Sequence, residues 1–488
     1  MKLLKVMCVM ALVVAVSAIA YAETQSVKVS GDITLRAFMR NNYDLDNDEA
    51  CIPGQSTDVA SYLTSTAELQ VDADLTDNVA GCVRLVNQRV WGDGLYESSA
   101  GAVTGTVDAP FKDQFTAAAV APGNPGAYAV MVDLAYIELK EFLYSPLTLR
   151  IGRQDLWFGK GFIIGANMQN PQGSLFSPEY TAITSFDAVR ATLDYDPWTI
   201  DAVYAKIAEN YRRADDDINL WGVNVGYVFD EYNAEAEGYW WYKNERYCGS
   251  TTPGNLIDVR NGHDSNDVHT LGLRGSFDPI EDWTIALEGA YQAGEYLGAN
   301  NQNDDRSRSA WAFDVMLECR YWQDDFAWRP VGGVEYIYYS GEADMGNVSQ
   351  TANGTYNGWD PMFRGKFDTA IREWQNVYYG TAMASGPSFT NQHQVLVRGT
   401  LEPTDSLTFD ATYANFWLDE AWAVRTTALA NENKSKYIGS EVDLQLTWDY
   451  TEDVSFNLLS GWFFPGGHFS SDRDDIATDI VGTVKLSF

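Results

Sequence analysis

Hydrophobic and polar residues alternate along many short segments of this chain, and residues 479–488 show the pattern most clearly. One face of this segment carries Ile480, Gly482, Val484, Leu486 and Phe488. The opposite face carries Asp479, Thr483, Lys485 and Ser487, with Val481 as the exception. A repeat of two residues is the period of a β-strand, because successive side chains point to opposite sides of the backbone. The segment is therefore predicted to be a strand with one apolar and one polar face.

Residues 27–36 repeat this pattern near the start of the chain. Val29, Ile33 and Leu35 share one face, whereas Asp32 and Arg36 share the other. An unpaired strand at the edge of a sheet exposes hydrogen-bonding groups. Pairing residues 27–36 with residues 479–488 would remove both edges and close the sheet into a barrel. A soluble sandwich whose final strand ends in Phe stays open as the alternative.

Short turn signals divide the chain into hairpins. Eight clusters rich in Asp, Pro, Thr and Ser lie near residues 75–77, 144–146, 195–197, 229–231, 278–281, 323–325, 402–405 and 450–453. These residue types favour tight turns. Eight hairpins contribute sixteen strands, and the first and last segments make eighteen. The predicted fold is all-β: a single closed antiparallel transmembrane β-barrel of about 18 strands, with short periplasmic turns and long extracellular loops.

Long polar connections separate the hairpins, and the longest are about residues 39–58, 95–128, 159–183, 245–265 and 341–389. In a barrel such connections lie outside the cell or fold into the lumen. Residues 159–183 contain Phe162 and Ile164, which need cover from water. This loop is predicted either to fold inward as a constriction or to pack over a neighbouring loop. Residues 341–389 are interpreted as a lid, with Trp359 and Phe363 as anchors.

One predicted strand loses its phase near residue 153. Leu149 and Ile151 share a face, whereas Leu156 and Phe158 have the opposite parity. A β-bulge inserts one extra residue and so reverses the faces of the residues that follow it. We therefore predict a bulge at residues 152–154, which would re-aim Arg153 or Gln154 and would add Arg153 to the inward-facing residues.

The composition favours an exported membrane protein. Lys2 and Lys5 precede an apolar run over residues 7–19, and residues 20–22 form a small-x-small cleavage site. Residues 1–22 are therefore predicted to be a signal peptide, and residues 23–488 a single barrel domain. No later run approaches the roughly 20 apolar residues of a membrane-spanning helix. Aromatic residues are nevertheless abundant, which favours a barrel in contact with the lipid of the bacterial outer membrane.

Charge and motifs exclude several other classes. The formal net charge of −35 argues against nucleic acid as a partner, because duplex binding needs a basic surface. The cysteines form no CxxC pair, and residues 44–48 lack the Gly and closing Glu of a calcium loop, so no metal and no cofactor are predicted. Histidines are scattered and Gly-x-Ser-x-Gly is absent, so no enzyme is predicted. Cys51 and Cys248 lie in loops of an oxidising compartment, where a disulfide between them is one alternative.

Strand parity places a set of charged residues on the predicted inner face. The candidates that would line a pore or contact its solute are Arg36, Arg84, Arg150, Arg153, Arg190, Arg274, Arg320, Arg398, Glu441 and Asp443. Guanidinium groups stay charged and bind carboxylates through two hydrogen bonds, so this lining suits an anionic sugar or organic acid. The alternative is that arginines and carboxylates of neighbouring strands pair and brace the wall.

Several short motifs carry a family resemblance. Residues 151–159, Ile-Gly-Arg-Gln-Asp-Leu-Trp-Phe-Gly, resemble the GRQ-containing strand of the alginate-export family of outer-membrane porins. Residues 185–190, 359–363 and 438–443 are similar to further motifs of that family, in the same order. The resemblance extends from about residue 130 to residue 488. It implies an eighteen-stranded barrel and passive export or diffusion of an anionic polysaccharide through an Arg-lined pore.

Two functions follow as hypotheses. The first is an outer-membrane channel for the passive passage of anionic or polar saccharides or similar small solutes. The second is a structural or adhesive outer-membrane barrel with an occluded lumen, which acts through its acidic extracellular loops. An alternating strand that ends in Phe also resembles the assembly signal of bacterial outer-membrane barrels. The barrel-assembly machinery is therefore an expected partner of the strand that ends at Phe488.

Overall fold

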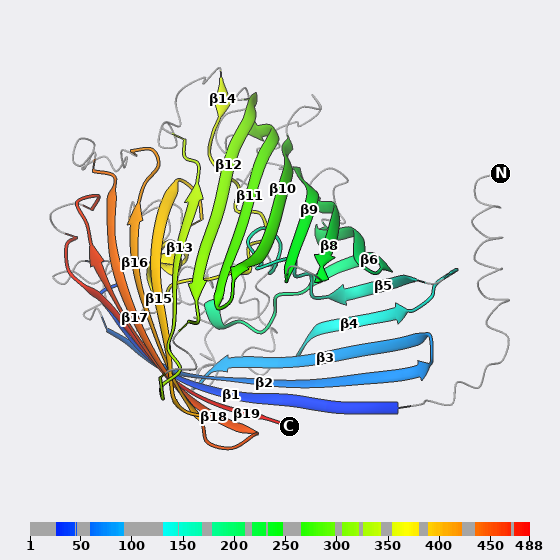
Figure 1. Cartoon of the computed structure of the whole chain (residues 1–488), viewed down its shortest axis with the longest axis horizontal. Coiled ribbons are helices and arrows are strands. Elements are labelled where there is room, and N and C mark those ends of the chain that lie inside the picture. Colours follow the sequence, from blue (N-terminus) through cyan, green and yellow to red (C-terminus); the bar gives the residue numbers. More distant parts are fainter. Residues whose placement is uncertain are drawn as a thin grey trace, which may run out of the picture.

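The computed structural model is a closed β-barrel whose strands follow one another around the wall in chain order (Figure 1). The structure describes residues 26–43, 45, 59–91, 130–144, 146–167, 178–209, 217–230, 233–246, 265–297, 305–321, 326–342, 354–379, 389–421, 435–469 and 473–488. The predicted signal peptide, residues 95–128 and the Cys51–Cys248 disulfide lie outside these ranges. Within them, no helix combines the length and the hydropathy needed to cross a membrane.

Eighteen antiparallel strands form the wall in the described part of the chain, in agreement with the predicted number. Their bounds are β1 (Ser26–Asn41), β2 (Val59–Thr76), β3 (Val79–Val90), β4 (Met131–Leu139), β5 (Leu147–Gln154), β6 (Phe186–Tyr195), β7 (Trp198–Ala208), β8 (Ile218–Phe229), β9 (Ala234–Arg246), β10 (Ser265–Ile280), β11 (Trp283–Leu297), β12 (Asp305–Cys319), β13 (Val331–Tyr339), β15 (Gln392–Thr404), β16 (Leu407–Trp417), β17 (Tyr437–Asp449), β18 (Val454–Pro465) and β19 (Ala477–Ser487). The additional elements are the two-residue strand β14 (Thr355–Tyr356), the 3₁₀-helix η2 (Pro178–Tyr180) and the helix α3 (Arg372–Tyr379). β14 runs parallel to β12 at its edge.

The barrel closes through the pair that the sequence predicts. β1 and β19 are antiparallel and pair from Asp32 opposite Ser487 to Asn41 opposite Thr478. Beyond β19, the backbones of Gly31 and Phe488 exchange two hydrogen bonds of 3.0 Å each. In Figure 1 the blue strand β1 accordingly lies beside the red end of the chain. Closure satisfies the hydrogen-bonding groups of both edge strands, which lipid could not do.

Short connections at one end of the barrel confirm most of the predicted turns. Two residues separate β2 from β3, β6 from β7, β10 from β11 and β15 from β16. The connections from β4 to β5 and from β12 to β13 are longer, with seven and eleven residues, and residues 323–325 lie outside the described ranges. The long connections lie at the other end of the barrel, as the alternation of short and long connections in the sequence predicts.

The strands direct apolar side chains outward and polar side chains inward, as the alternation predicts. In β12, Trp311 and Phe313 are exposed, whereas Asp314 is buried inside the barrel. Aromatic rings also pair on the outer wall beside the short turns, where Trp198 and Tyr227 lie 4.7 Å apart between ring centroids. Such rings suit the boundary between lipid and water because one end is apolar and the other polar.

The bulge predicted in β5 is absent. β5 pairs with both β4 and β6 without a shift of register. The strand ends at Gln154 and the chain then leaves the wall, so the change of parity at Leu156 reflects the end of the strand. Arg153 consequently shares the outward face with Ile151, and its predicted inward position is wrong. It pairs across the sheet with Asp187, at 3.3 Å between Nη1 and Oδ2.

Candidate functional site

Two loop segments enter the barrel and pack against its inner wall. Inward segment A comprises residues 156–166, and inward segment B comprises residues 354–379, which include β14 and α3. The amide of Phe363 donates to the carbonyl of Ile163 at 3.0 Å, and the amide of Gly165 donates to the carbonyl of Phe363 at 2.7 Å. Lys160 of segment A also reaches the Sδ of Met316, on the inner face of β12, at 3.4 Å. The two segments therefore support each other within the lumen.

Apolar side chains of segment A find cover inside the barrel. Phe162 and Ile164 are buried. The ring of Phe158 lies 4.8 Å from that of Trp241 in β9, and the ring of Phe162 lies 5.6 Å from that of Tyr339 in β13. For the loop of residues 159–183 the sequence predicts either inward folding or packing on a neighbouring loop. The structure combines them, because segment A contacts the wall and segment B together.

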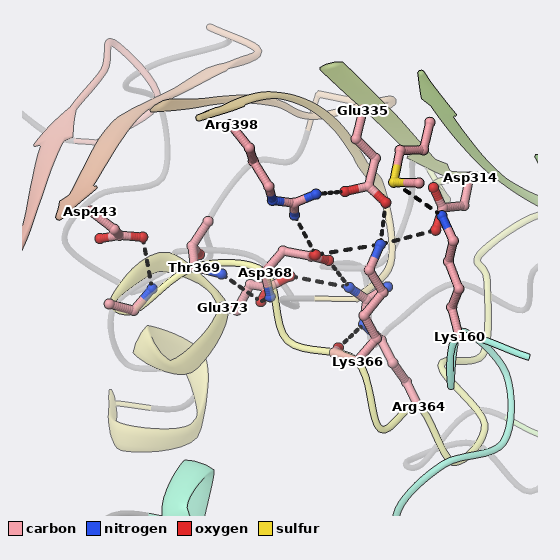
Figure 2. A network of polar contacts seen from close by, with 12 residues as sticks. Lys160, Asp314, Glu335, Arg364, Lys366, Asp368, Thr369, Glu373, Arg398 and Asp443 are labelled. Carbon is pink, nitrogen blue, oxygen red and sulfur yellow. Dashed lines mark hydrogen bonds and ion pairs between the residues drawn. The ribbon is translucent and has the colours of Figure 1, made fainter. Parts of the chain in front are cut away.

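A buried group of charges, the central charge cluster, joins segment B to the wall (Figure 2). It consists of Asp314, Glu335, Arg364, Lys366, Asp368, Glu373 and Arg398. Lys366 Nζ lies 3.0 Å from Asp314 of β12 and also contacts Glu335 of β13. Arg398 of β15 contacts Glu335 and lies 2.5 Å from Asp368. Side chains from three strands thus hold a single stretch of segment B.

The cluster keeps its central lysine charged. Burial alone would lower the pKa of Lys366, but the carboxylates of Asp368, Asp314 and Glu335 outweigh burial and raise this pKa above its usual value. Three cations and four carboxylates then neutralise one another almost completely. Losing one member of a buried network is costly because its partners stay buried without compensation. The cluster therefore favours one fixed position of segment B.

Glu441 and Asp443, two of the predicted lining residues, bind the N-terminus of α3. The amides of Ile371 and Arg372 donate to the carboxylate of Glu441 at 2.7 and 2.9 Å, and the amide of Ala370 donates to Asp443 at 3.1 Å. The first amides of a helix lack partners within the helix and attract anions. Both carboxylates lie on the inner face, as parity predicts. They are buried beneath α3, so they anchor segment B and do not face open lumen.

A second buried pair anchors the beginning of segment B. Lys243 Nζ of β9 lies 2.8 Å from both carboxylate oxygens of Asp360. The side-chain amide of Gln292 in β11 forms two hydrogen bonds of 2.8 Å with the backbone of Asp360. Burial would raise the pKa of Asp360, but the ammonium of Lys243 lowers it below its usual value. Trp359 and Phe363, the anchors predicted for this loop, are buried here as well.

Four predicted arginines form ion pairs in which the guanidinium is the more exposed partner. Arg84 pairs with Asp133, Arg150 with Glu138, Arg190 with Asp201 and Arg398 with Glu335. The exposed fractions of the arginine side chains are 20%, 32%, 24% and 31%, against 0%, 15%, 4% and 1% for the carboxylates. The pairs brace the wall, and at Arg150, Arg190 and Arg398 the exposed surface is mainly that of the cation, whereas Arg84 also lies 3.3 Å from Asp155, whose side chain is 48% exposed. The same arginines therefore both brace the wall and line the lumen.

The remaining predicted arginines behave differently. Arg274 pairs with Glu235 at 3.1 Å, and here the carboxylate is the more exposed partner. Arg320 lies just beyond the end of β12 and pairs with Glu318 at 2.7 Å, and the two side chains are exposed to similar degrees, 37% and 31%. Arg36 has no ion pair within the described residues and stacks over the ring of Tyr180, with 4.6 Å between the guanidinium carbon and the ring centroid. The arginines whose carboxylate partners are all largely covered therefore lie on β5, β6 and β15.

Strand parity cannot identify the loop residues at the centre of the site. Arg364 and Lys366 lie in a connection without a two-residue period, so no face can be assigned to them. A different signal is present in the sequence: residues 364–373, Arg-Gly-Lys-Phe-Asp-Thr-Ala-Ile-Arg-Glu, mix both signs of charge at short spacing. Arg40, on the inward face of β1, is also absent from the predicted set. It contacts Glu179 of η2 and lies 3.4 Å from Asp479 of β19.

Comparisons with known proteins agree with this architecture. The protein-family profile described as Alginate export matches residues 57–483. The structure of Pseudomonas aeruginosa OccK2 (OpdF) in complex with glucuronate aligns with a TM-score of 0.52 and 12% identity, over 95% of this chain and 99% of that chain. Acinetobacter baumannii OccAB4 aligns with a TM-score of 0.52 and 11% identity, over 96% and 100%. A search of curated proteins gives no match.

The structural and sequence comparisons support different statements. At such low identity the likeness to solved structures establishes the fold, a porin-like barrel. The family match spans most of the chain and agrees with the resemblance of residues 151–159. Together they indicate a β-barrel of the bacterial outer membrane that serves as a channel for small solutes. The chain belongs to the alginate export family.

Proposed function

We propose that the barrel is a passive channel for anionic or polar saccharides, or for small organic acids of similar size. One observation carries the proposal: in four ion pairs of the inner wall the arginine is the exposed partner. At Arg150, Arg190 and Arg398 a solute carboxylate that passes this surface meets a cation whose own partner is largely covered. Arg84 has a covered partner in Asp133 but also lies 3.3 Å from Asp155, whose side chain is 48% exposed. Guanidinium groups bind carboxylates through two parallel hydrogen bonds, which suits uronic acids in particular.

Partial neutralisation is compatible with transport. A bare cation would hold an anion tightly, whereas a channel must release each solute after binding it. In the pair of Arg190 and Asp201 the guanidinium Nε donates to Oδ1 at 2.8 Å, and the Thr192 hydroxyl donates to the same oxygen at 2.6 Å. The carboxylate is thus occupied by two donors. The outer edge of the guanidinium then remains to bind a passing anion weakly and to release it quickly.

Ion selectivity in planar bilayers tests the proposal. Replacing Arg150 by Gln removes a lining cation, whereas Glu138→Gln removes its partner and should have the opposite effect. A unit charge at a few ångströms is worth about 1 kcal/mol in water, so we expect the anion-to-cation permeability ratio to change by about two- to fivefold in opposite directions. Arg153→Gln on the outward face is the matched control and should leave the ratio unchanged.

Glucuronate and glucose distinguish an anion channel from a general pore. Glucuronate should block the chloride current at lower concentration than glucose, and Arg150→Gln should raise the glucuronate concentration required. A preparation that is folded but shows no conductance would reject the channel. Equal block by both sugars in the native protein would reject the preference for anions and leave a channel for polar solutes.

The second candidate, a structural or adhesive barrel with an occluded lumen, rests on a different observation. Segments A and B occupy part of the lumen, and buried ion pairs fix segment B to the wall. Its acidic extracellular loops lie largely outside the described residues. Absence of conductance together with calcium-dependent binding of cells to a surface would favour this function over transport.

A further inference from the structure

The outer wall of the barrel has a hollow over β8 to β11, on the strands that carry the pair of Arg274 and Glu235. Its volume is about 560 Å³. Ala236 of β9 and Gly275 of β10 lie opposite each other in the register and form its floor. Leu273, Phe277 and Leu287 surround this floor. These five residues occupy outward positions by strand parity, so the hollow opens toward lipid.

The hollow exists because small residues interrupt an otherwise bulky surface. Leu273 is 73% exposed, and its partners in the register are Gly238 on one side and Gly289 on the other. A Cβ added to Gly238 would lie 3.3 Å from Cδ2 of Leu273, so this side chain leans over β9 and forms one wall. The volume falls in the range of ligand sites, roughly 300–1,000 Å³. If the hollow were empty, its lining atoms would have no neighbours on one side and would lose their dispersion contacts there.

The periplasmic rim of the hollow is acidic. Asp230 lies in the turn between β8 and β9, and Glu281 and Asp282 form the turn between β10 and β11. Residues 229–234 and 277–283 contain no Lys or Arg. The adjoining Arg320, whose backbone amide donates to the carbonyl of Asp282 at 2.7 Å, has its guanidinium paired with Glu318 at 2.7 Å. The side-chain amide of Asn233, in the first turn, donates to Asp278 near the end of β10. This rim repels an anionic head group and attracts an ammonium group.

We propose that the hollow binds one phospholipid of the periplasmic leaflet whose head group carries a primary amine. An acyl chain lies over Ala236 and Gly275, and the ammonium group of the lipid meets the acidic turns. The site continues a surface suited to lipid, because large apolar side chains such as Leu273, Phe277 and Leu287 are exposed on the outward face around it. A flexible acyl chain can fill the recess, whereas the convex wall of a second barrel would leave it largely empty.

Native mass spectrometry of the detergent-solubilised protein tests the site, with phosphatidylethanolamine and phosphatidylglycerol as probes. The native protein should retain one phosphatidylethanolamine under conditions that strip other lipids. Ala236→Leu fills the floor and should lower the retained fraction at least tenfold. Ala202→Leu makes the same change on the outward face of β7 and should retain the lipid as the native protein does. The heat-dependent mobility shift of folded barrels on SDS gels verifies that both variants fold.

A second variant tests the role of the acidic rim. Glu281→Gln combined with Asp282→Asn should abolish the preference for phosphatidylethanolamine over phosphatidylglycerol while the acyl chain still binds. Equal lipid retention by the native protein and Ala236→Leu would overturn the proposal, as would equal binding of the two lipids by the native protein. A dimer of the native protein that Ala236→Leu abolishes would also overturn it, because the occupant would then be a second copy of the chain.

Discussion

Lys366 shows how a single residue can fix a loop inside a water-filled barrel. Its ammonium group contacts Asp314 and Glu335, which belong to neighbouring wall strands, and lies 3.4 Å from Asp368 of its own segment. The sequence predicts the inward position of wall residues such as Arg398, because strands have a period of two. It does not predict the partners of Arg398, since two of the residues in the cluster around it, Lys366 and Asp368, come from a loop.

The first prediction at the residue scale concerns Lys366. In Lys366→Met the three carboxylates lose their shared cation, and breaking a buried pair on one side costs about 3–5 kcal/mol. We expect segment B to detach from the wall, which should increase the noise of the open-channel current and make residues 354–379 sensitive to added protease. Lys485→Met is the control, because Lys485 is half exposed and, among the residues that the structure describes, pairs only with Asp32, at 3.4 Å. Quiet currents and protease resistance like those of the native protein would contradict the role given to Lys366.

At the scale of elements, the strands could be predicted and the inward segments only in part. Turn residues and alternation identify the hairpins because both depend on short stretches of sequence. The end of β5 at Gln154 could not be distinguished from a bulge, since either reverses the parity of Leu156. Likewise, Glu441 has the sequence pattern of a lining residue, but its partner is the N-terminus of a helix contributed by another loop. These contacts join segments distant in the chain, so no local pattern reveals them.

Close contact between segments A and B gives a prediction at this scale. A Cβ added to Gly365 would lie 2.7 Å from the backbone of Gly165, so Gly365→Ala must push the segments apart. Overpacking of this kind costs about 1–3 kcal/mol. We expect faster hydrogen exchange at the amides of Phe363 and Gly165, which join the two segments, and a higher single-channel conductance.

A matched glycine provides the control for Gly365→Ala. Gly482 of β19 has no atom within 4 Å of an added Cβ, so Gly482→Ala should change neither measurement. If hydrogen exchange rises while conductance stays the same, segments A and B do not limit the flow of ions. If neither changes, the packing between the segments described above is incorrect.

At the scale of the whole molecule, closure was predictable because it follows from a general requirement. Every backbone group in lipid needs a partner, so the two edge strands must meet. The register could not be predicted in the same way, but the structure supplies it, with Ile33 opposite Leu486 and Leu35 opposite Val484. Substrate and assembly partner depend on other molecules, which no feature of the fold identifies.

Phe488 provides the prediction at this scale. Its backbone exchanges two hydrogen bonds with Gly31, which Phe488→Ala keeps, whereas its ring serves as the expected assembly signal. The variant should therefore refold in detergent with nearly native yield but reach the outer membrane of cells poorly. Quantifying the heat-modifiable folded form in both settings makes the comparison. If the variant loses equal fractions of folded protein in detergent and in cells, the effect is one of barrel stability. If it loses none in either setting, the ring of Phe488 is not an assembly signal.

The pairing of β1 with β19 also determines when the protein can first exist as a barrel. The hydroxyl of Ser487 donates to Asp32, which lies 455 residues earlier. One edge of β1 therefore has no pairing partner in the periplasm until the rest of the chain, including β19, has also been exported. During that interval it is a template for any other extended chain it meets. A cell that makes this protein faster than its periplasmic chaperones can shield such intermediates should accumulate aggregates rather than additional channels.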